Sequence, residues 1–292
     1  MRPGDFLDFW KSTIEEAGAC LRDVRVVPSD YAPAGMLEGR WDVSWTGWAG
    51  IRVGGWLWKP MTCKGRLPAV VYFPGYGGQV WDRSDFARRG FVAFAASPRG
   101  GTLSDPEYRE NVPSMLTHGI TAPAEYAFRG AYVDAVQAMS FVRGLAEVDC
   151  ERVYAMGASC GAALAIAAAA LGRGVRAVSA ECPFMTDFPY VADHVQAGPY
   201  GEVVRFVKDH QEMREAALST LAYFDTVSLA PEVNVPTILS YGEADVVCPP
   251  ATIRRLFDAL RCVKAIVAYP GRTHDRGGDF LELSLRWFET HS

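Results

Sequence analysis

The order of apolar and amphipathic segments restricts the fold of this chain more than any other feature. Short, continuous apolar runs alternate with segments whose apolar residues recur at helical spacing. The runs lie at 67–78, 90–101, 152–159, 175–183, 235–245 and 264–274, and the helical segments at 129–145, 160–171, 250–261 and 278–289. A strand that is apolar on both faces must be covered by helices on both sides, so the alternation predicts an α/β fold around a mostly parallel sheet.

Two regions depart from this alternation. Before it, residues 5–20 have the pattern of an amphipathic helix, and large and small residues alternate over 40–58 at the period of antiparallel strands. Within it, residues 184–234 contain helical patterns, and we expect a helical insertion over the carboxyl ends of the strands, the edge where α/β sheets bind ligands. No linker, repeat or low-complexity segment divides the sequence, so residues 1–292 are predicted to form one domain.

A G-x-S-x-G motif lies where a predicted strand meets a predicted helix. Its residues are Gly157, Ser159 and Gly161. At such a junction the serine takes a strained backbone conformation, and the residues two positions away pass so close together that glycine is favoured. Ser159 is therefore the candidate nucleophile. Cys160 is a rival, because a thiol at a helix N-terminus can have a lowered pKa; since the turn projects its central residue, we expect Cys160 to contribute chiefly its backbone N–H.

A serine hydroxyl needs a general base, and His274 has the best position among the five histidines. It follows the last apolar run and precedes the last helical segment, which places it at the same edge of the sheet as Ser159. The others lie in an irregular loop (His118), in the predicted insertion (His194 and His210) and beside the C-terminus (His291). We expect these four to have structural or surface roles.

Asp245 is the candidate carboxylate that orients His274, because it ends the run at 235–245. Glu243 is the alternative, while Asp275 is less suited because the side chains of neighbouring loop residues rarely align. The order Ser159, Asp245, His274 is the order found in α/β-hydrolases. We therefore predict an α/β-hydrolase fold with a Ser-His-Asp site.

The tetrahedral oxyanion of an ester-cleaving reaction would need two N–H donors. We assign the backbone amide of Cys160 to one position. The second donor is expected from the glycine-rich loop FPGYGG, where the amide of Tyr76 would face Ser159.

With these residues in place, the chain resembles the acetyl xylan esterase / cephalosporin-C deacetylase family of carbohydrate esterases. The resemblance covers nearly the whole sequence and includes DFLDFW, GYGG, PRGG, LTHGI, GASCGAALA, ECPFMTDF, PYGEVVRF, TLAYFDTVSLA, GEADVVCPP and THDRGG. It implies hydrolysis of acetyl esters of small, varied alcohols, with Ser159, His274 and Asp245 in the roles above. It also implies a cytoplasmic protein that assembles as a trimer of dimers around an inner cavity.

The sequence departs from the pattern of that family at three motif positions. Cys160 stands where glutamine usually follows the serine, Gly101 replaces the glutamine of R-G-Q-G, and Asp275 replaces the glutamate after the histidine. The amide of residue 160 survives any change of side chain. These departures are therefore expected to alter pocket shape and assembly rather than the reaction.

We expect a serine esterase that hydrolyses short-chain acyl oxygen esters, chiefly acetyl esters, of a carbohydrate or another small-molecule alcohol such as a secondary metabolite. The reaction would pass through an acyl-enzyme and need no cofactor. Tyr76, Trp81 and Phe184 are the candidates for contacting substrate and limiting the acyl group. The alternatives are a hydrolase or acyltransferase of the same fold acting on a different ester, lactone, thioester or peptide, and a non-catalytic protein that only binds in the pocket.

Charge and cysteine content restrict the partners. The net charge of −5 is spread along the chain, without the basic cluster that nucleic-acid binding requires. Acidic residues stand where a signal peptide needs an apolar run, and no stretch resembles a membrane span. The seven scattered cysteines fit a reducing cytoplasm, and no His/Cys cluster in the sequence has metal-ligand spacing. We expect a cytoplasmic homo-oligomer, a dimer or trimer of dimers, with a small ester as its ligand and no nucleic acid, membrane or metal.

Overall fold

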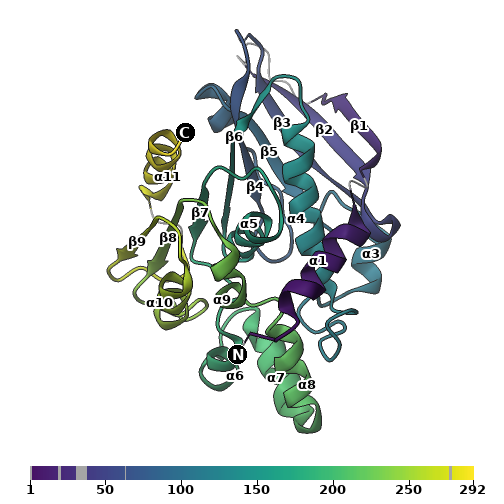
Figure 1. Ribbon diagram of the computed structural model, residues 1–292, viewed down its shortest axis with the longest axis vertical. Helices are drawn as coiled ribbons and strands as arrows, with labels where there is room; N and C mark the ends of the chain where they lie inside the picture. Colours follow the sequence, from purple (N-terminus) through teal and green to yellow (C-terminus); the bar gives the residue numbers. More distant parts are fainter. Residues whose placement is uncertain (1, 19–20, 31–37, 63, 276–277) are drawn as a thin grey trace.

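A twisted sheet runs through the centre of the computed structural model, which describes residues 2–18, 21–30, 38–62, 64–275 and 278–292 (Figure 1). The described strands follow one another across the sheet in the order β1-β2-β3-β5-β4-β6-β7-β8-β9. Their bounds are β1 (Arg22–Pro28), β2 (Glu38–Thr46), β3 (Arg52–Pro60), β4 (Leu67–Phe73), β5 (Val92–Ser97), β6 (Val148–Ala158), β7 (Val178–Glu181), β8 (Thr237–Gly242) and β9 (Lys264–Tyr269).

The predicted parallel sheet is confirmed for the strands from β4 to β9. Neighbouring strands from β5 across to β9 pair in parallel, whereas β1, β2 and β3 pair antiparallel and β3 joins β5 antiparallel. Each apolar run overlaps one of the parallel strands. Strand β1 was not expected, because its seven residues are exposed along their whole length and carry no apolar alternation that could reveal a strand.

Helices cover both faces of the sheet, and the alternation of side chains along each strand decides which residues meet them. Val71 and Phe73 of β4 belong to the core shared with helices α1, α4, α5 and α10, whereas Val70 and Tyr72 face α2 and α11. The helices on the first face are α1 (Phe6–Ala17), α4 (Ala127–Arg143), α5 (Cys160–Leu171) and α10 (Pro250–Ala259), and those on the second are α2 (Ser84–Arg88) and α11 (Phe280–Thr290). Burial of each large apolar side chain stabilises this layered arrangement by about 1.5–3 kcal/mol.

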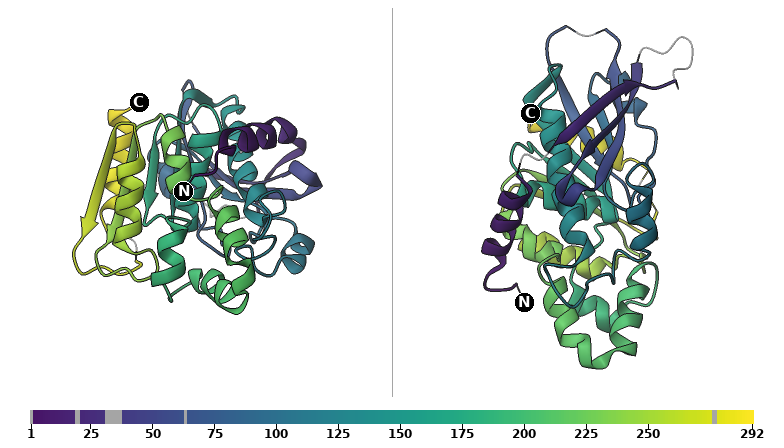
Figure 2. Two further views of the ribbon diagram at one scale, coloured as in Figure 1. Left: turned by 60° about the horizontal axis from the view of Figure 1, so that its bottom comes forward. Right: turned by 90° about the vertical axis from the view of Figure 1, so that its right-hand side faces the viewer.

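Four helices occupy the segment between β7 and β8 and gather at one end of the molecule (Figures 1 and 2). They are α6 (Phe188–His194), α7 (Tyr200–Asp209), α8 (Arg214–Leu221) and α9 (Thr226–Leu229). The buried carboxylate of Asp225 holds both ends of this segment, because it accepts hydrogen bonds from the amides of Asp187 at 2.9 Å, Phe188 at 2.8 Å and Val227 at 2.9 Å. The start of α6 and the start of α9 are therefore held together at the side chain of Asp225.

Short helical turns complete the described elements. Helix α3 spans Pro106–Asn111, and three single 3₁₀ turns lie at Trp48–Gly50, Gln211–Met213 and Ala230–Glu232. Within the part of the chain that the structure describes, no helix is both long enough and apolar enough to cross a lipid bilayer.

Candidate active site

Ser159 is the single residue between β6 and α5, and its backbone conformation is unfavourable for a residue with a side chain. Its φ is 56° and its ψ is −120°. A Cβ atom on Gly157 would lie 2.3 Å from the carbonyl carbon of Gly161, and a Cβ atom on Gly161 would lie 2.1 Å from the carbonyl oxygen of Phe73. Because backbone crowds both positions, only glycine fits on either side of the strained serine.

Three side chains from different parts of the chain meet at this turn. The Nε2 atom of His274, which follows β9, lies 3.2 Å from the Oγ atom of Ser159. The Nδ1 atom of the same ring lies 2.8 Å from Oδ2 of Asp245, which follows β8. An ionised carboxylate only accepts hydrogen bonds, so this contact assigns the ring proton to Nδ1 and leaves the Nε2 lone pair toward Ser159.

The carboxylate of Asp245 is held rigidly by its own loop. The amides of Val247 and Cys248 both donate to its Oδ1 atom at 2.8 Å, and the side chain is fully buried. Only Oδ2 is left for the imidazole. Since His274 keeps 27% of its side chain exposed, the pair has a buried acceptor and an accessible ring.

The alternatives considered from the sequence lie elsewhere. The carboxylate of Asp275 pairs with Arg272 at 2.9 Å, and Glu243 is exposed. The other histidines are also occupied or distant: His194 contacts the carbonyl of Tyr190, His210 packs on Phe206, His291 packs on Trp287, and His118 is exposed. His274 is therefore the histidine that the structure places in hydrogen-bond contact with Ser159, and Asp245 is the carboxylate that contacts the other nitrogen of its ring.

The two amides assigned to the oxyanion belong to segments that border Ser159. Cys160 is the first residue of α5, so its N–H has no acceptor within the helix. Tyr76 lies in the turn after β4, which is closed by a 3.0 Å hydrogen bond from the amide of Gly78 to the carbonyl of Gly75. That bond leaves the N–H of Tyr76 outside the turn's own hydrogen bonding.

Helix α7 holds this turn through the side chain of Tyr76. The phenol hydroxyl donates to Oε2 of Glu202 at 3.1 Å, and the hydroxyl of Ser114 donates to the same carboxylate oxygen. Burial, with the negative charge of Glu202 in second place, raises the pKa of Tyr76 well above its ordinary value. The phenol therefore stays neutral and remains a donor. Glu202 was missed in the sequence, because an acidic residue in the first turn of an amphipathic helix is ordinary there.

A pocket of about 270 Å³ opens over the serine. Its walls include Tyr76, Trp81, Cys182, Ser159 and His274. Trp81, which was expected to contact substrate, is 50% exposed there, so its ring is available at the pocket.

Phe184 does not lie in this pocket. Its side chain is fully buried and stacks on Tyr200 with ring centroids 3.9 Å apart. Its ring also packs against Tyr76. The expectation that Phe184 contacts substrate is therefore replaced by a supporting position beneath Tyr76, where a ring without exposed surface cannot meet a ligand.

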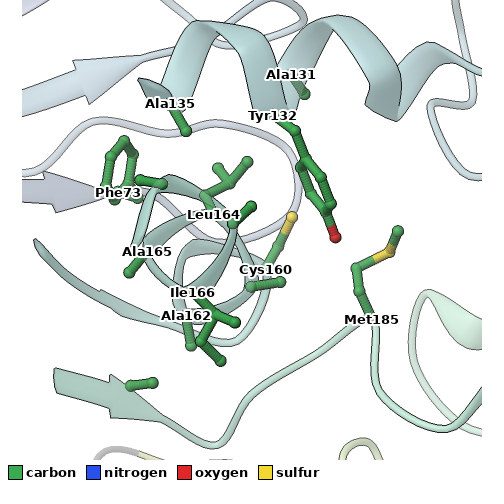
Figure 3. Packing of buried hydrophobic residues seen from close by; sticks show 14 of the residues in the cluster. Phe73, Ala131, Tyr132, Ala135, Cys160, Ala162, Leu164, Ala165, Ile166 and Met185 are labelled. Carbon is green, nitrogen blue, oxygen red and sulfur yellow. The ribbon is translucent and has the colours of Figure 1, made fainter. Parts of the chain in front are cut away.

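The thiol of Cys160 is buried in the apolar core. Figure 3 shows its sulfur on the side of α5 that faces Tyr132 of α4. Burial raises the pKa of this thiol to about 12, so burial outweighs any lowering by the helix N-terminus. At neutral pH Cys160 is a neutral thiol, which argues against it as the nucleophile.

A second cavity of about 210 Å³ also borders the turn that carries Tyr76. Cys160 and Gly101 both border it, together with Leu164 and Met115. These are two of the three motif positions at which the sequence departs from its family pattern. These two departures therefore lie at this cavity, which shares Gly75 and Tyr76 with the pocket over Ser159, whereas the third departure, Asp275, lines the pocket over Ser159.

A strained serine at a strand-to-helix turn, on the carboxyl edge of a mostly parallel sheet, defines the α/β-hydrolase class of fold. The sequence model described as "Acetyl xylan esterase (AXE1)" matches residues 1–291. The chain belongs to the acetyl xylan esterase family of carboxylic ester hydrolases, as the resemblance of its motifs predicted.

Individual relatives agree with this assignment. The chain is 26% identical over 93% of its length to acetyl esterase Axe7A of Xylanibacter ruminicola, and the match spans 63% of that longer relative. Acetyl xylan esterase 1 from Thermoanaerobacterium sp. superposes with a TM-score of 0.91 at 27% identity, covering 100% of this chain and 95% of the other. Acetyl xylan esterase from Paenibacillus sp. R4 gives a TM-score of 0.92 at 26% identity, covering 100% and 96%.

Proposed function

We propose that this protein is a serine esterase in which Ser159 is the nucleophile, His274 the general base and Asp245 the residue that orients the histidine. The carrying observation is one imidazole in hydrogen-bond contact with both the serine hydroxyl at 3.2 Å and a buried carboxylate at 2.8 Å. The three side chains come from three different loops at one edge of the sheet. Chance contacts between exposed polar residues rarely include a fully buried carboxylate that also accepts two backbone hydrogen bonds.

In the proposed reaction, Ser159 Oγ attacks the ester carbonyl while its proton passes to Nε2 of His274. Asp245 keeps the other ring proton on Nδ1 and stabilises the imidazolium that forms. The protonated histidine then gives its proton to the leaving alcohol, and a water molecule repeats the sequence on the acyl-enzyme. All of these steps use the two contacts that His274 already makes.

The amides of Tyr76 and Cys160 are proposed to bind the oxyanion of the tetrahedral intermediate. Preorganised N–H donors of this kind contribute about 10²–10³ each to the rate, because they need no reorganisation as charge develops. The amide of Cys160 is fixed by the first turn of α5. The amide of Tyr76 is fixed by its turn and by the hydrogen bond from its side chain to Glu202.

The proposed substrates are short-chain acyl esters, chiefly acetyl esters, of carbohydrates or other small-molecule alcohols. The family assignment supports the acetyl group, and the 270 Å³ pocket is small enough to favour a short acyl chain. Tyr76 and Trp81 line that pocket. The half-exposed ring of Trp81 offers an apolar face to the alcohol part of the ester.

The remaining parts of the proposal concern the whole chain. We infer one α/β-hydrolase domain over residues 1–292, with 184–234 as a helical insertion, in a cytoplasmic homo-oligomer that is a dimer or a trimer of dimers. The cytoplasm is supported by the described cysteines Cys150, Cys160, Cys182, Cys248 and Cys262, which are all thiols. Light scattering coupled to size-exclusion chromatography would measure the assembly directly.

A series of p-nitrophenyl esters from acetate to octanoate tests the substrate class. We expect kcat/KM to be highest for acetate and to fall steadily with chain length. A fluorophosphonate probe should add one label per chain at Ser159, visible by mass spectrometry. Ser159→Ala should abolish both signals, whereas Ser140→Ala, at an exposed position of α4, should leave both intact. Hydrolysis that persists in Ser159→Ala would contradict the proposal.

A further inference from the structure

A thiol lies beside the histidine and the aspartate of the proposed catalytic site. Cys182 directly follows β7, and its amide donates to the carbonyl of Ser240 at 2.8 Å. Its Sγ atom, a nitrogen of His274 and a carboxylate oxygen of Asp245 all lie within 4.8 Å of one another. Cys182 also lines the pocket that contains Ser159 and His274, so two of the three donors border a space that a solute can enter, and the buried carboxylate of Asp245 lies directly behind them.

These donors match the preferences of zinc. Thiolate, imidazole and carboxylate are its usual protein ligands, at bond lengths of about 2.3, 2.0–2.1 and 2.0–2.2 Å. With tetrahedral angles, such bonds place neighbouring donor atoms roughly 3.4–3.6 Å apart. Atoms already within 4.8 Å need to move by only about 1 Å to reach that spacing.

The surroundings prepare the site in two further ways. The carboxylate of Asp245 is already oriented, because its other oxygen accepts hydrogen bonds from two backbone amides at 2.8 Å. Metal binding therefore requires no further ordering of this side chain. An ion held by Asp245 and by Nδ1, the ring nitrogen that faces Asp245, has room for a water molecule from the pocket that Cys182 lines as its fourth ligand. Three protein ligands with one open position are an arrangement in which zinc is stable.

We propose that Cys182, His274 and Asp245 form an inhibitory binding site for Zn²⁺ and similar thiophilic divalent ions. Binding converts the Cys182 thiol to a thiolate and releases one proton to solvent, without any change of oxidation state. The metal is a regulator or inhibitor here, with no part in the ester chemistry. The binding itself is independent of the proposed function, whereas the inhibition rests on it.

Inhibition follows whichever ring nitrogen binds the ion. Coordination through Nδ1, which the contact with Asp245 favours, is the three-ligand arrangement, and an ion held through Nε2 without Asp245 would use the lone pair that accepts the proton of Ser159. Coordination through Nδ1 moves the ring proton to Nε2, so that the nitrogen facing Ser159 becomes a donor. In both cases His274 can no longer act as a base.

The experiment compares the full-length wild-type chain with Cys182→Ser, which keeps the shape of the side chain and removes the soft ligand. Cys150→Ser is the matched control, because Cys150 lies at the opposite end of β6 from Ser159.

Each protein is assayed with p-nitrophenyl acetate during titration with ZnCl₂, then with excess EDTA, and separately with MgCl₂. We expect Zn²⁺ to inhibit the wild type and Cys150→Ser equally and EDTA to restore activity. Mg²⁺, which prefers oxygen ligands, should have no effect. Cys182→Ser should need at least about tenfold more Zn²⁺ for half-inhibition.

A spectroscopic titration keeps the test independent of esterase activity and of the folding of any one variant. CoCl₂ added to the wild type should produce a thiolate-to-cobalt charge-transfer band in the near ultraviolet, and Zn²⁺ should displace it. The catalytically silenced Ser159→Ala variant should show the same band, and Cys182→Ser should lack it. Absence of the band in the wild type, or equal sensitivity of wild type and Cys182→Ser to Zn²⁺, would overturn the inference. A band without any esterase activity would overturn the proposed function and leave the metal site standing.

Discussion

The tightest approach at the nucleophile turn lies between Gly161 and the end of β4, and Gly161→Ala tests whether this approach matters. The new methyl group would lie 2.1 Å from the carbonyl oxygen of Phe73 and 2.7 Å from its carbonyl carbon. Carbon and carbonyl oxygen normally stay about 3.3–3.6 Å apart. The strand and helix must therefore separate by roughly 1 Å at this point. Both partners are backbone, so no side chain can turn aside to make room.

The functional cost follows from what moves with Gly161. The amide of Cys160 precedes it in the first turn of α5 and would be carried away from the proposed oxyanion position. A misplacement of about 1 Å can cost about 10²-fold in rate, and complete loss of one oxyanion donor costs about 10²–10³-fold. We therefore expect kcat/KM for p-nitrophenyl acetate to fall by at least about 100-fold. Overpacking should also lower the free energy of unfolding by about 1–3 kcal/mol.

Gly144→Ala provides the matched control. Gly144 ends α4 with a φ of −80°, and an added Cβ atom would find its nearest neighbour at 3.4 Å, an ordinary contact. This variant should keep wild-type activity and stability. Steady-state kinetics and urea unfolding of both variants give the comparison. If Gly161→Ala keeps more than about a third of the wild-type kcat/KM, the claim that backbone crowding positions the Cys160 amide is wrong.

Three further changes test other parts of the site. Asp245→Asn should lower kcat by about 10⁴-fold in p-nitrophenyl acetate hydrolysis, because an amide at that position favours the wrong tautomer of His274; a decrease confined to KM would contradict this role. Glu202→Leu removes the acceptor for the hydroxyls of Tyr76 and Ser114 and should lower kcat about tenfold or more, with KM less affected, whereas Glu202→Gln keeps an acceptor and should retain most activity. Burial raises the pKa of Asp225 to about 6 from an ordinary value of 3.8, so the folded state binds its proton more tightly and loses this stability as pH rises from 4 to 7. The unfolding free energy of the wild type relative to Asp225→Asn should therefore fall by about 2 kcal/mol over that range in urea titrations, and a constant difference would refute the assignment.

The parallel part of the sheet could be predicted because its strands are buried on both faces. Each of these strands left a continuous apolar run, and each run ends at the same edge of the sheet. That common edge is why Ser159, Asp245 and His274 could be grouped from their order alone, although 29 residues separate Asp245 from His274 and 115 separate Ser159 from His274. Strand β1 could not be found in this way, because none of its side chains is buried.

Side-chain direction is what the sequence could not supply. Phe184 looked like a pocket residue, yet the chain turns it beneath Tyr76, and only the packing against Tyr200 reveals this. Glu202 carries no local signal, since its role depends on a hydroxyl 126 positions away. Cys182 does carry a signal in the sequence: it lies near the end of the apolar run at 175–183 and so had to emerge at the same edge as His274.

The cysteines near Ser159 show how burial decides which nucleophile this edge offers. Burial raises the pKa of the Cys160 thiol to about 12 and that of Cys248 well above its ordinary value, so neither forms an appreciable thiolate at neutral pH. The serine has His274 as its proposed base, whereas for Cys248 burial outweighs the hydrogen bond with Ser159 that would lower its pKa. Cys182 differs from both because it reaches the pocket beside His274 and Asp245. The geometry that is proposed to activate the Ser159 hydroxyl therefore also places a soft ligand next to its proposed base, His274. A metal ion that binds the Cys182 thiol together with His274 must either take the imidazole lone pair that faces Ser159 or move the ring proton to that nitrogen. We therefore expect ester hydrolysis and metal binding at this edge to be mutually exclusive.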